Sequence, residues 1–146
     1  MTTPDAYRAT LRTPRRSEEA DGQRQGPLVV IVPMLPPSQN HMYLLNKDGS
    51  RRLSDEAKTF REYAGLEARS TASLTGWRVP TGRLKFTLLL TFGSRRKTDV
   101  DNRIKSALDA LALALGFDDS RVDEIIVRRV GVEPGRLLCE MILEGL

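Results

Sequence analysis

The alternation of apolar and polar positions along the chain predicts four strands. Aliphatic residues at 28–32 form a β-rich run that predicts the first strand. The run at 84–92 alternates at first and then becomes almost wholly apolar, which predicts a central strand. We expect a third strand at 122–130 and, after a Pro-Gly turn, a fourth at 137–143 that pairs back on it as a hairpin.

Two helices are predicted from apolar positions that recur every three to four residues. Ser54 is a good N-cap for a helix over residues 55–69, with a loop expected after it. The clearest periodicity lies within residues 99–115, and Gly116 follows it where a helix C-cap belongs. Between the first strand and the first helix, prolines keep the chain out of a helix, and residues 47–50 predict a turn.

This order of elements predicts an α+β fold with a mixed β-sheet and two main helices. Residues 27–146 have the length of one domain. Residues 1–26 are polar, contain several arginines and are interrupted by proline and glycine, so we expect a disordered N-terminal arm. A non-specific contact between this arm and DNA is the weaker alternative.

Composition narrows the possible partners and metal sites. Lysine and arginine number 23 against 19 acidic residues, and the net charge of +4 is consistent with a phosphate-bearing partner. Aromatic residues make up only 5% of the chain, which disfavours a base-stacking surface. The chain has one cysteine, Cys139, and one histidine, His41, so a single chain cannot form a Cys/His zinc site. We expect Cys139 to be a small residue of the core. No apolar run approaches the roughly 20 residues of a membrane helix, so we expect no membrane partner and a cytoplasmic protein.

Two aspartates at the start of the second periodic segment are candidate metal ligands. Asp99 and Asp101 are two residues apart, and in extended chain this spacing places both carboxylates on one side. Paired carboxylates suit Mg²⁺, a hard cation that takes few protein ligands. Lys105 follows Asp101 by one helical turn and could reach a phosphate beside the metal. The structural alternatives are helix capping by either aspartate and an ion pair of Lys105 with Asp101 or Asp109.

A second acidic pair, Asp118 and Asp119, follows the predicted C-terminus of this helix. The helix macrodipole is negative there, so adjacent carboxylates repel both each other and the helix end, and a bound cation would relieve the repulsion. An ordinary exposed turn is the structural alternative.

The distance between the two acidic clusters predicts a dimer. The intervening helix of about 14 residues is roughly 20 Å long, so the clusters of one chain cannot share a metal if the helix is straight. Two such helices packed antiparallel about a two-fold axis would bring the first cluster of one chain to the second cluster of the other. We therefore expect a homodimer with two equivalent metal sites.

Three motifs together resemble the signature of the RusA family of Holliday-junction resolvases. They are the Asp-x-Asp-Asn-x-x-Lys pattern at 99–105, the Asp-Asp pair at 118–119 and the Pro-Ser-x-Asn pattern at 37–40. A lone Asp-x-Asp is common, whereas the three patterns in this order are far more specific. The resemblance extends over residues 28–143, in the same order as in the family.

The resemblance implies an intertwined, RusA-like dimer that nicks four-way DNA junctions symmetrically in recombination and repair. It implies a requirement for Mg²⁺, with Mn²⁺ as a substitute, and a bacterial or phage-infected host cell. By position, Asp99, Asp101 and Asp119 match the family's catalytic aspartates, with Asp118 beside them. Lys105 matches a catalytic or DNA-contacting lysine. These assignments follow from the resemblance and not from the spacing alone.

Basic and polar residues near the first cluster are candidate DNA ligands. Arg95, Arg96 and Lys97 directly precede it and could bind the phosphate backbone, as could Arg103. Asn40 could orient the site or a strand, although a turn after two prolines explains it nearly as well. Arg51 and Arg52 are weaker candidates. The alternative functions are a nuclease for flaps or forks, and a DNA-binding protein whose acidic cluster is only structural.

Overall fold

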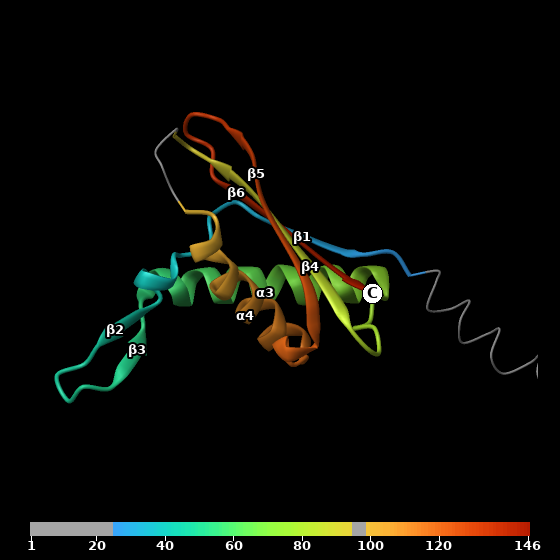
Figure 1. The fold of residues 1–146 in the computed structure, drawn as a ribbon, viewed down its shortest axis with the longest axis horizontal. Helices are drawn as coiled ribbons and strands as arrows, with labels where there is room; N and C mark the ends of the chain where they lie inside the picture. Colours follow the sequence, from blue (N-terminus) through green and yellow to red (C-terminus); the bar gives the residue numbers. More distant parts are fainter. Residues whose placement is uncertain (1–24, 95–98) are drawn as a thin grey trace, which may run out of the picture.

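The computed structural model describes residues 25–94 and 99–146 and contains one mixed sheet with two helices on one side (Figure 1). The sheet has the strand order β1-β6-β4-β5. Its strands are β1 (Leu28–Val32), β4 (Leu84–Phe92), β5 (Val122–Val132) and β6 (Leu138–Gly145). The helices are α3 (Asp55–Thr75) and α4 (Ile104–Leu115). The predicted α+β class with a mixed sheet and two main helices is confirmed.

Helix α4 explains why the sheet is mixed. It connects β4 to β5, and a helical crossover lets the two strands run parallel. All other pairings in the sheet, of β1 with β6 and of β4 with β6, are antiparallel. Strand β4 lies between β6 and β5, as its apolar run predicted. Residues 104–115 are helical and end at Gly116, which has the left-handed φ of 74° expected of a C-cap glycine.

The core lies between the sheet and the two helices. Alternate side chains of β1, β4 and β6 are buried on this face, and Phe60 of α3 and Leu111 of α4 are almost wholly buried against them. Cys139 is buried here too, as expected, and burial raises the pKa of its thiol to about 12. Cys139 is therefore a neutral core residue.

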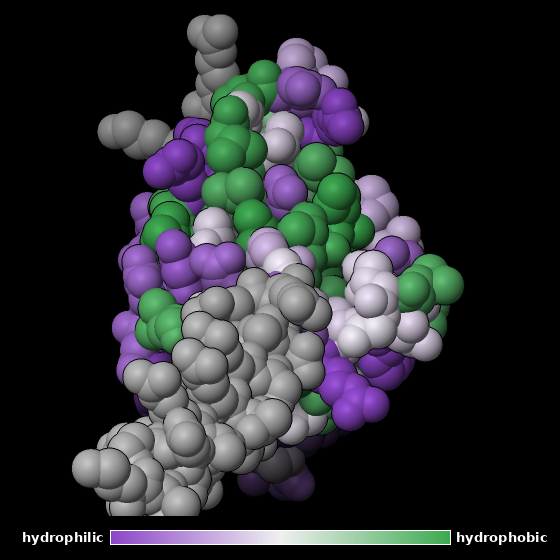
Figure 2. All heavy atoms as spheres, turned by 90° about the vertical axis from the view of Figure 1, so that its right-hand side faces the viewer, coloured by the Kyte–Doolittle hydropathy of each residue, from purple (hydrophilic) through white to green (hydrophobic). Residues whose placement is uncertain are grey.

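Neither of the two helices in the described part of the chain lies over the other face of the sheet. Val29 and Ile31 point to this side of β1 and are 37% and 51% exposed, between buried neighbours. Figure 2, seen from the right-hand side of Figure 1, shows hydrophobic side chains gathered in a band in its upper half. An exposed apolar surface of this kind is common where proteins contact one another.

The predicted hairpin of the last two strands is wrong. Strands β5 and β6 do not pair along their length, because β4 lies between them. The connection crosses the end of β4, where the Glu133 amide donates to the Phe92 carbonyl at 3.0 Å. Five connecting residues span up to about 16 Å, enough to cross two strand spacings of roughly 4.8 Å each.

Helix α3 is longer than predicted and ends at Thr75 instead of residue 69. Residues 70–75 are mostly serine and threonine, which are weak helix formers, so the sequence favours a loop there. Ala68 is fully buried and Ala72 packs against the core, so tertiary packing extends the helix. Gly76, with φ 69°, then ends it.

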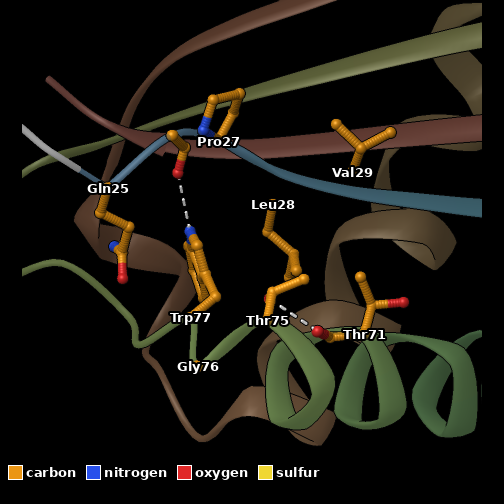
Figure 3. A pocket seen from close by; sticks show the side chains of 9 residues that line it. Gln25, Pro27, Leu28, Val29, Thr71, Thr75, Gly76 and Trp77 are labelled. Carbon is orange, nitrogen blue, oxygen red and sulfur yellow. Dashed lines mark hydrogen bonds between the residues drawn. The ribbon is translucent and has the colours of Figure 1, made fainter.

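The chain before β1 is bonded to the end of α3. Gln25 exchanges hydrogen bonds with the backbone of Arg78, and the Trp77 indole N–H donates to the Gly26 carbonyl at 3.1 Å (Figure 3). These contacts border a pocket of about 490 Å³. Residues 25 and 26, which were predicted to belong to the arm, therefore belong with the folded domain, and the rest of the predicted arm lies outside the described residues.

A small second sheet was not predicted. After the 3₁₀ helix η1 (Gln39–His41), strands β2 (Tyr43–Leu45) and β3 (Arg51–Leu53) form an antiparallel ribbon around the predicted turn. The ribbon projects from the domain beside the start of α3 (Figure 1).

Within the described part of the chain, no helix is long and apolar enough to cross a membrane.

Gly65 allows α3 and α4 to pack closely, and a bulky side chain there should separate them. A Cβ at this position would lie 3.4 Å from the Ala114 Cβ and 3.3 Å from the end of the flexible Arg69 side chain. We predict that Gly65→Leu lowers the free energy of unfolding by about 1–3 kcal/mol in urea titrations. Gly65→Ala is the matched control and should be neutral or stabilising by up to about 1 kcal/mol, because alanine is the better helix former. Equal stability of the two variants would contradict this packing.

Candidate active site

The first acidic cluster lies where the chain enters α4. Asp99 and Asp101 are both exposed, and Asp101 begins the 3₁₀ helix η2 (Asp101–Arg103), which runs directly into α4. The extended geometry predicted here is wrong, because Val100 already has helical φ and ψ of −75° and −34°. At the described starts of η2 and α4, no side chain makes a capping hydrogen bond. Neither Asp99 nor Asp101 therefore caps η2 or α4.

The proline-rich motif is fastened to this end of α4. Ser106 is buried, and its hydroxyl donates to the Pro37 carbonyl at 2.7 Å. Arg103 Nη1 donates to the Pro36 carbonyl, also at 2.7 Å. Helix η1, which contains the exposed Asn40, lies beside η2. The fold therefore brings together two motifs that are about 60 residues apart, and it places Asn40 and Asp101 in neighbouring elements.

Arg103 has a structural role that the sequence did not suggest. Its guanidinium carbon lies 5.7 Å from the centre of the Phe92 ring, within the range of a cation–π contact. Burial lowers its pKa, with Glu56 acting in the opposite direction, and its Nε is buried without a hydrogen-bond partner among the described residues. Its side chain thus braces η2 against the sheet, and its predicted contact with DNA stays a prediction.

Lys105 forms an ion pair with Asp109, one of the two alternatives considered for it. The Nζ atom lies 3.4 Å from the carboxylate, and the lysine side chain is 51% exposed. The Asp109 side chain is half-buried, but the lysine end of the pair is exposed, and such a pair one helical turn apart stabilises a helix by only about 0.3–0.5 kcal/mol. The ammonium group can therefore leave Asp109 for a phosphate at little cost.

The second acidic cluster lies in the turn after α4, at the 3₁₀ helix η3 (Asp119–Arg121). The Asp118 carboxylate accepts a hydrogen bond from the Ser120 amide at 2.9 Å, and this bond holds the pKa of Asp118 below its ordinary value. The Asp118 side chain therefore stabilises the turn. Asp119 is the exposed neighbour that begins η3.

A pocket of about 460 Å³ opens beside this second cluster. Its lining includes both acidic residues, the exposed side of α4 and one arginine of α3: Arg61, Asp109, Ala112, Leu113, Gly116, Phe117, Asp118 and Asp119. Arg61 had no role in the sequence analysis, because only the fold brings the middle of α3 to the end of α4. It adds a positive charge to the lining of the pocket that also contains the two carboxylates.

Two further arginines hold the turn in place and were also missed. Arg121 donates to the carbonyl oxygens of Pro80 and Gly82 in the loop before β4. Arg83 donates to the Ser120 carbonyl and forms an ion pair with Asp123, which lowers the pKa of that carboxyl. Both arginines bind backbone oxygens of other segments, contacts that no local pattern reveals. They leave the carboxylates of the second cluster uncovered.

Helix α4 keeps the two clusters apart within one chain. It is continuous over twelve residues, which corresponds to a length of about 18 Å. Within residues 25–94 and 99–146, no three histidine, cysteine or acidic side chains gather into a group that could hold a metal. A shared metal site therefore needs a second source of carboxylates or a large rearrangement.

A partly exposed stripe of α4 connects the two clusters, with Lys105 and Leu113 exposed and Asp109 and Ala112 half-buried. Positions 105, 109, 112, 113 and 116 recur every three to four residues and follow one side of the helix. Leu113 on this stripe is 66% exposed, although it is a large apolar residue. By contrast, the opposite side of α4, which includes Leu108 and Leu111, is buried in the core.

The predicted basic cluster of Arg95, Arg96 and Lys97 lies outside the described residues. Ser94 follows the end of β4 and Asp99 precedes η2, and the undescribed segment 95–98 lies between them. The three basic residues therefore lie next to the first acidic cluster in sequence, and their predicted contact with DNA stays a prediction.

Comparison with known proteins agrees with the motifs. A family model described as endodeoxyribonuclease RusA matches residues 33–141, which is most of the chain. The matched region contains the proline-rich motif, both acidic clusters and all of α4. No curated protein matches the chain.

We predict that Arg121 fixes the turn that contains Asp119. In Arg121→Lys the charge remains, but the forked contact with two carbonyl groups is lost. The Ser120 and Arg121 amides should then exchange hydrogen about five to ten times faster, as expected for a loss of roughly 1 kcal/mol, while the amides of α4 stay protected. Arg128→Lys, at an exposed position of β5, is the matched control. Unchanged exchange in the turn would show that Arg121 does not hold it.

Proposed function

This chain belongs to the RusA family of endodeoxyribonucleases, which resolve Holliday junctions, and we propose that it cuts four-way DNA as a Mg²⁺-dependent homodimer. As a family member it is a hydrolase of phosphodiester bonds in DNA. The paired symmetric nicks, the preference for Mg²⁺ with Mn²⁺ as a substitute, and the roles of individual residues belong to the proposal. So does action on recombination intermediates in the bacterial or phage-infected cytoplasm.

The observation that supports the proposal is the position of the two acidic clusters at opposite ends of α4. The stripe between them exposes Leu113, and the small residue Ala112 beside it is half-buried, so a second α4 could approach closely. In an antiparallel pair of such helices, Asp99 and Asp101 of one subunit face Asp119 of the partner subunit. A two-fold axis creates two equivalent sites, which suits two cuts in one symmetric junction.

The residues present fit a hard divalent cation. Asp99, Asp101 and Asp119 are exposed carboxylates that offer only oxygen donors. Asp118 is a less favourable ligand, because one of its oxygens accepts from the Ser120 amide. The chemistry that Mg²⁺ supplies in such a site is activation of water and neutralisation of charge on the phosphate.

The chain's own basic and polar groups position the DNA. Lys105 lies one helical turn from Asp101, and its ammonium can exchange Asp109 for the phosphate that is cut. Asn40 lies in the element beside η2 and can orient a strand. Arg95, Arg96 and Lys97 extend this surface by binding backbone phosphates, with Arg103 as a further candidate.

The proposal predicts that cleavage depends on Mg²⁺ and on Asp101. A labelled mobile four-way junction should be cut with Mg²⁺ and should stay intact with EDTA. Asp101→Asn should keep junction binding, because no cationic DNA ligand is lost, but it should slow cleavage at least about a hundredfold. Glu62→Gln, at an exposed position of α3, is the control for the loss of a carboxylate and should cut normally.

Three results would contradict the assignment. Cleavage by Asp101→Asn at the wild-type rate would remove Asp101 from the site. Faster cleavage of flaps or forks than of four-way junctions would make another branched DNA the substrate. Binding without any metal-dependent nicking would identify a DNA-binding protein without catalytic activity.

A further inference from the structure

The β2–β3 ribbon projects from the domain and has no core of its own (Figure 1). Its strands are three residues long, and all their side chains are exposed except that of Leu53, which is half-buried. Leu44 and Leu45 are 44% and 75% exposed. A two-stranded hairpin alone is marginally stable in water, so this ribbon needs other support or a partner.

Hydrogen bonds at both ends of the ribbon hold it in shape. At its base, the Ser54 amide donates to the Met42 carbonyl at 2.8 Å, and the Ser54 hydroxyl donates to the His41 carbonyl at 2.6 Å. At its tip, the Asn46 amide donates to the Ser50 carbonyl at 2.8 Å. Asp48 accepts from the hydroxyl and amide of Ser50, which hold the pKa of Asp48 below its ordinary value. The ribbon is thus preformed, and it needs little ordering when it binds.

The ribbon is basic on both faces. Residues 43–53 contain three cationic side chains and a single acidic one, Asp48, which is occupied within the turn. The register places Arg51 opposite Leu45 and Arg52 opposite Leu44, so each face has an arginine beside a leucine. Of the ion pairs among the described residues, none involves Arg51, Arg52 or Lys47. These charges are therefore available to a partner.

The ribbon is rigidly connected to the first acidic cluster. Strand β2 follows η1 after one residue, and η1 lies beside η2, where Asp101 is located. The chain that leads into η1 is bonded to α4 through Arg103 and Ser106. DNA held by the ribbon would therefore be held at a fixed distance from the carboxylates.

We propose that the β2–β3 ribbon is a DNA-binding arm that holds one duplex arm of a branched substrate. Arg51, Arg52 and Lys47 bind backbone phosphates, and Leu44 and Leu45 pack against the groove between them. A two-stranded ribbon has the width that a major groove accepts, and a preformed cationic surface suits phosphates. This inference rests on the proposed cleavage of branched DNA and assigns part of its substrate binding to residues outside the metal site.

The test measures binding of a four-way junction in EDTA, so that the DNA stays uncut, over a series of salt concentrations. Arg51→Gln combined with Arg52→Gln should weaken binding at least about tenfold near 0.1 M salt and reduce the salt slope by about two. Arg69→Gln combined with Arg78→Gln removes the same charge from exposed positions near the far end of α3 and serves as the control. It should change affinity and slope much less.

The outcomes separate this inference from the proposed function. If the ribbon variant binds the junction as tightly as the control variant does, the ribbon is not a DNA-binding arm, although Mg²⁺-dependent cleavage by the wild type would stand. If the ribbon variant becomes monomeric in sedimentation where the wild type is dimeric, the ribbon is a subunit contact and the inference fails. Wild-type protein that neither binds nor cuts junctions would overturn the proposed function itself.

Discussion

Helix α4 is a rigid spacer between the two acidic clusters, and this spacing constrains how the nuclease can form a metal site. Its twelve residues separate the clusters by about 18 Å, far more than the reach of two ligands of one cation. Its buried side is fixed in the core by Leu108 and Leu111, so it cannot bend without loss of packing. Its exposed side, with Leu113 at 66% exposure, is left for another surface. This geometry supports the proposal that a second subunit completes the metal site.

The rest of the fold fixes the two ends of this spacer. At the N-terminal end, Arg103 and Ser106 bind the proline-rich segment, which also leads into the β2–β3 ribbon. At the C-terminal end, Arg83 and Arg121 bind the turn that contains Asp119 to neighbouring segments. Most of these contacts are charge-assisted hydrogen bonds from arginine to backbone oxygens. Such bonds are strong, so a few residues fix the position of each segment. They leave the candidate carboxylates Asp99, Asp101 and Asp119 exposed.

Local patterns predicted much of the fold, and non-local packing decided what they missed. Residues 28–32 and 84–92 are strands because their apolar alternation is strong, and Gly116 ends α4 because only its left-handed conformation fits there. The predicted hairpin failed because β4 lies between β5 and β6, a choice that no turn residue encodes. The three-residue strands of the ribbon were too short to give a periodic signal. The acidic motifs were visible in sequence, whereas their positioning arginines act across the fold.

Complementation between two inactive variants tests most directly whether one metal site is built from two subunits. Asp101→Asn and Asp119→Asn are purified separately, and their subunits are then exchanged. If the site is shared, a mixed dimer contains one site with both substitutions and one intact site, so the mixture should nick a four-way junction in one strand. If each site lies within one subunit, both sites of the mixed dimer are damaged. A mixture that forms mixed dimers and stays inactive would show that the metal site is not shared between subunits.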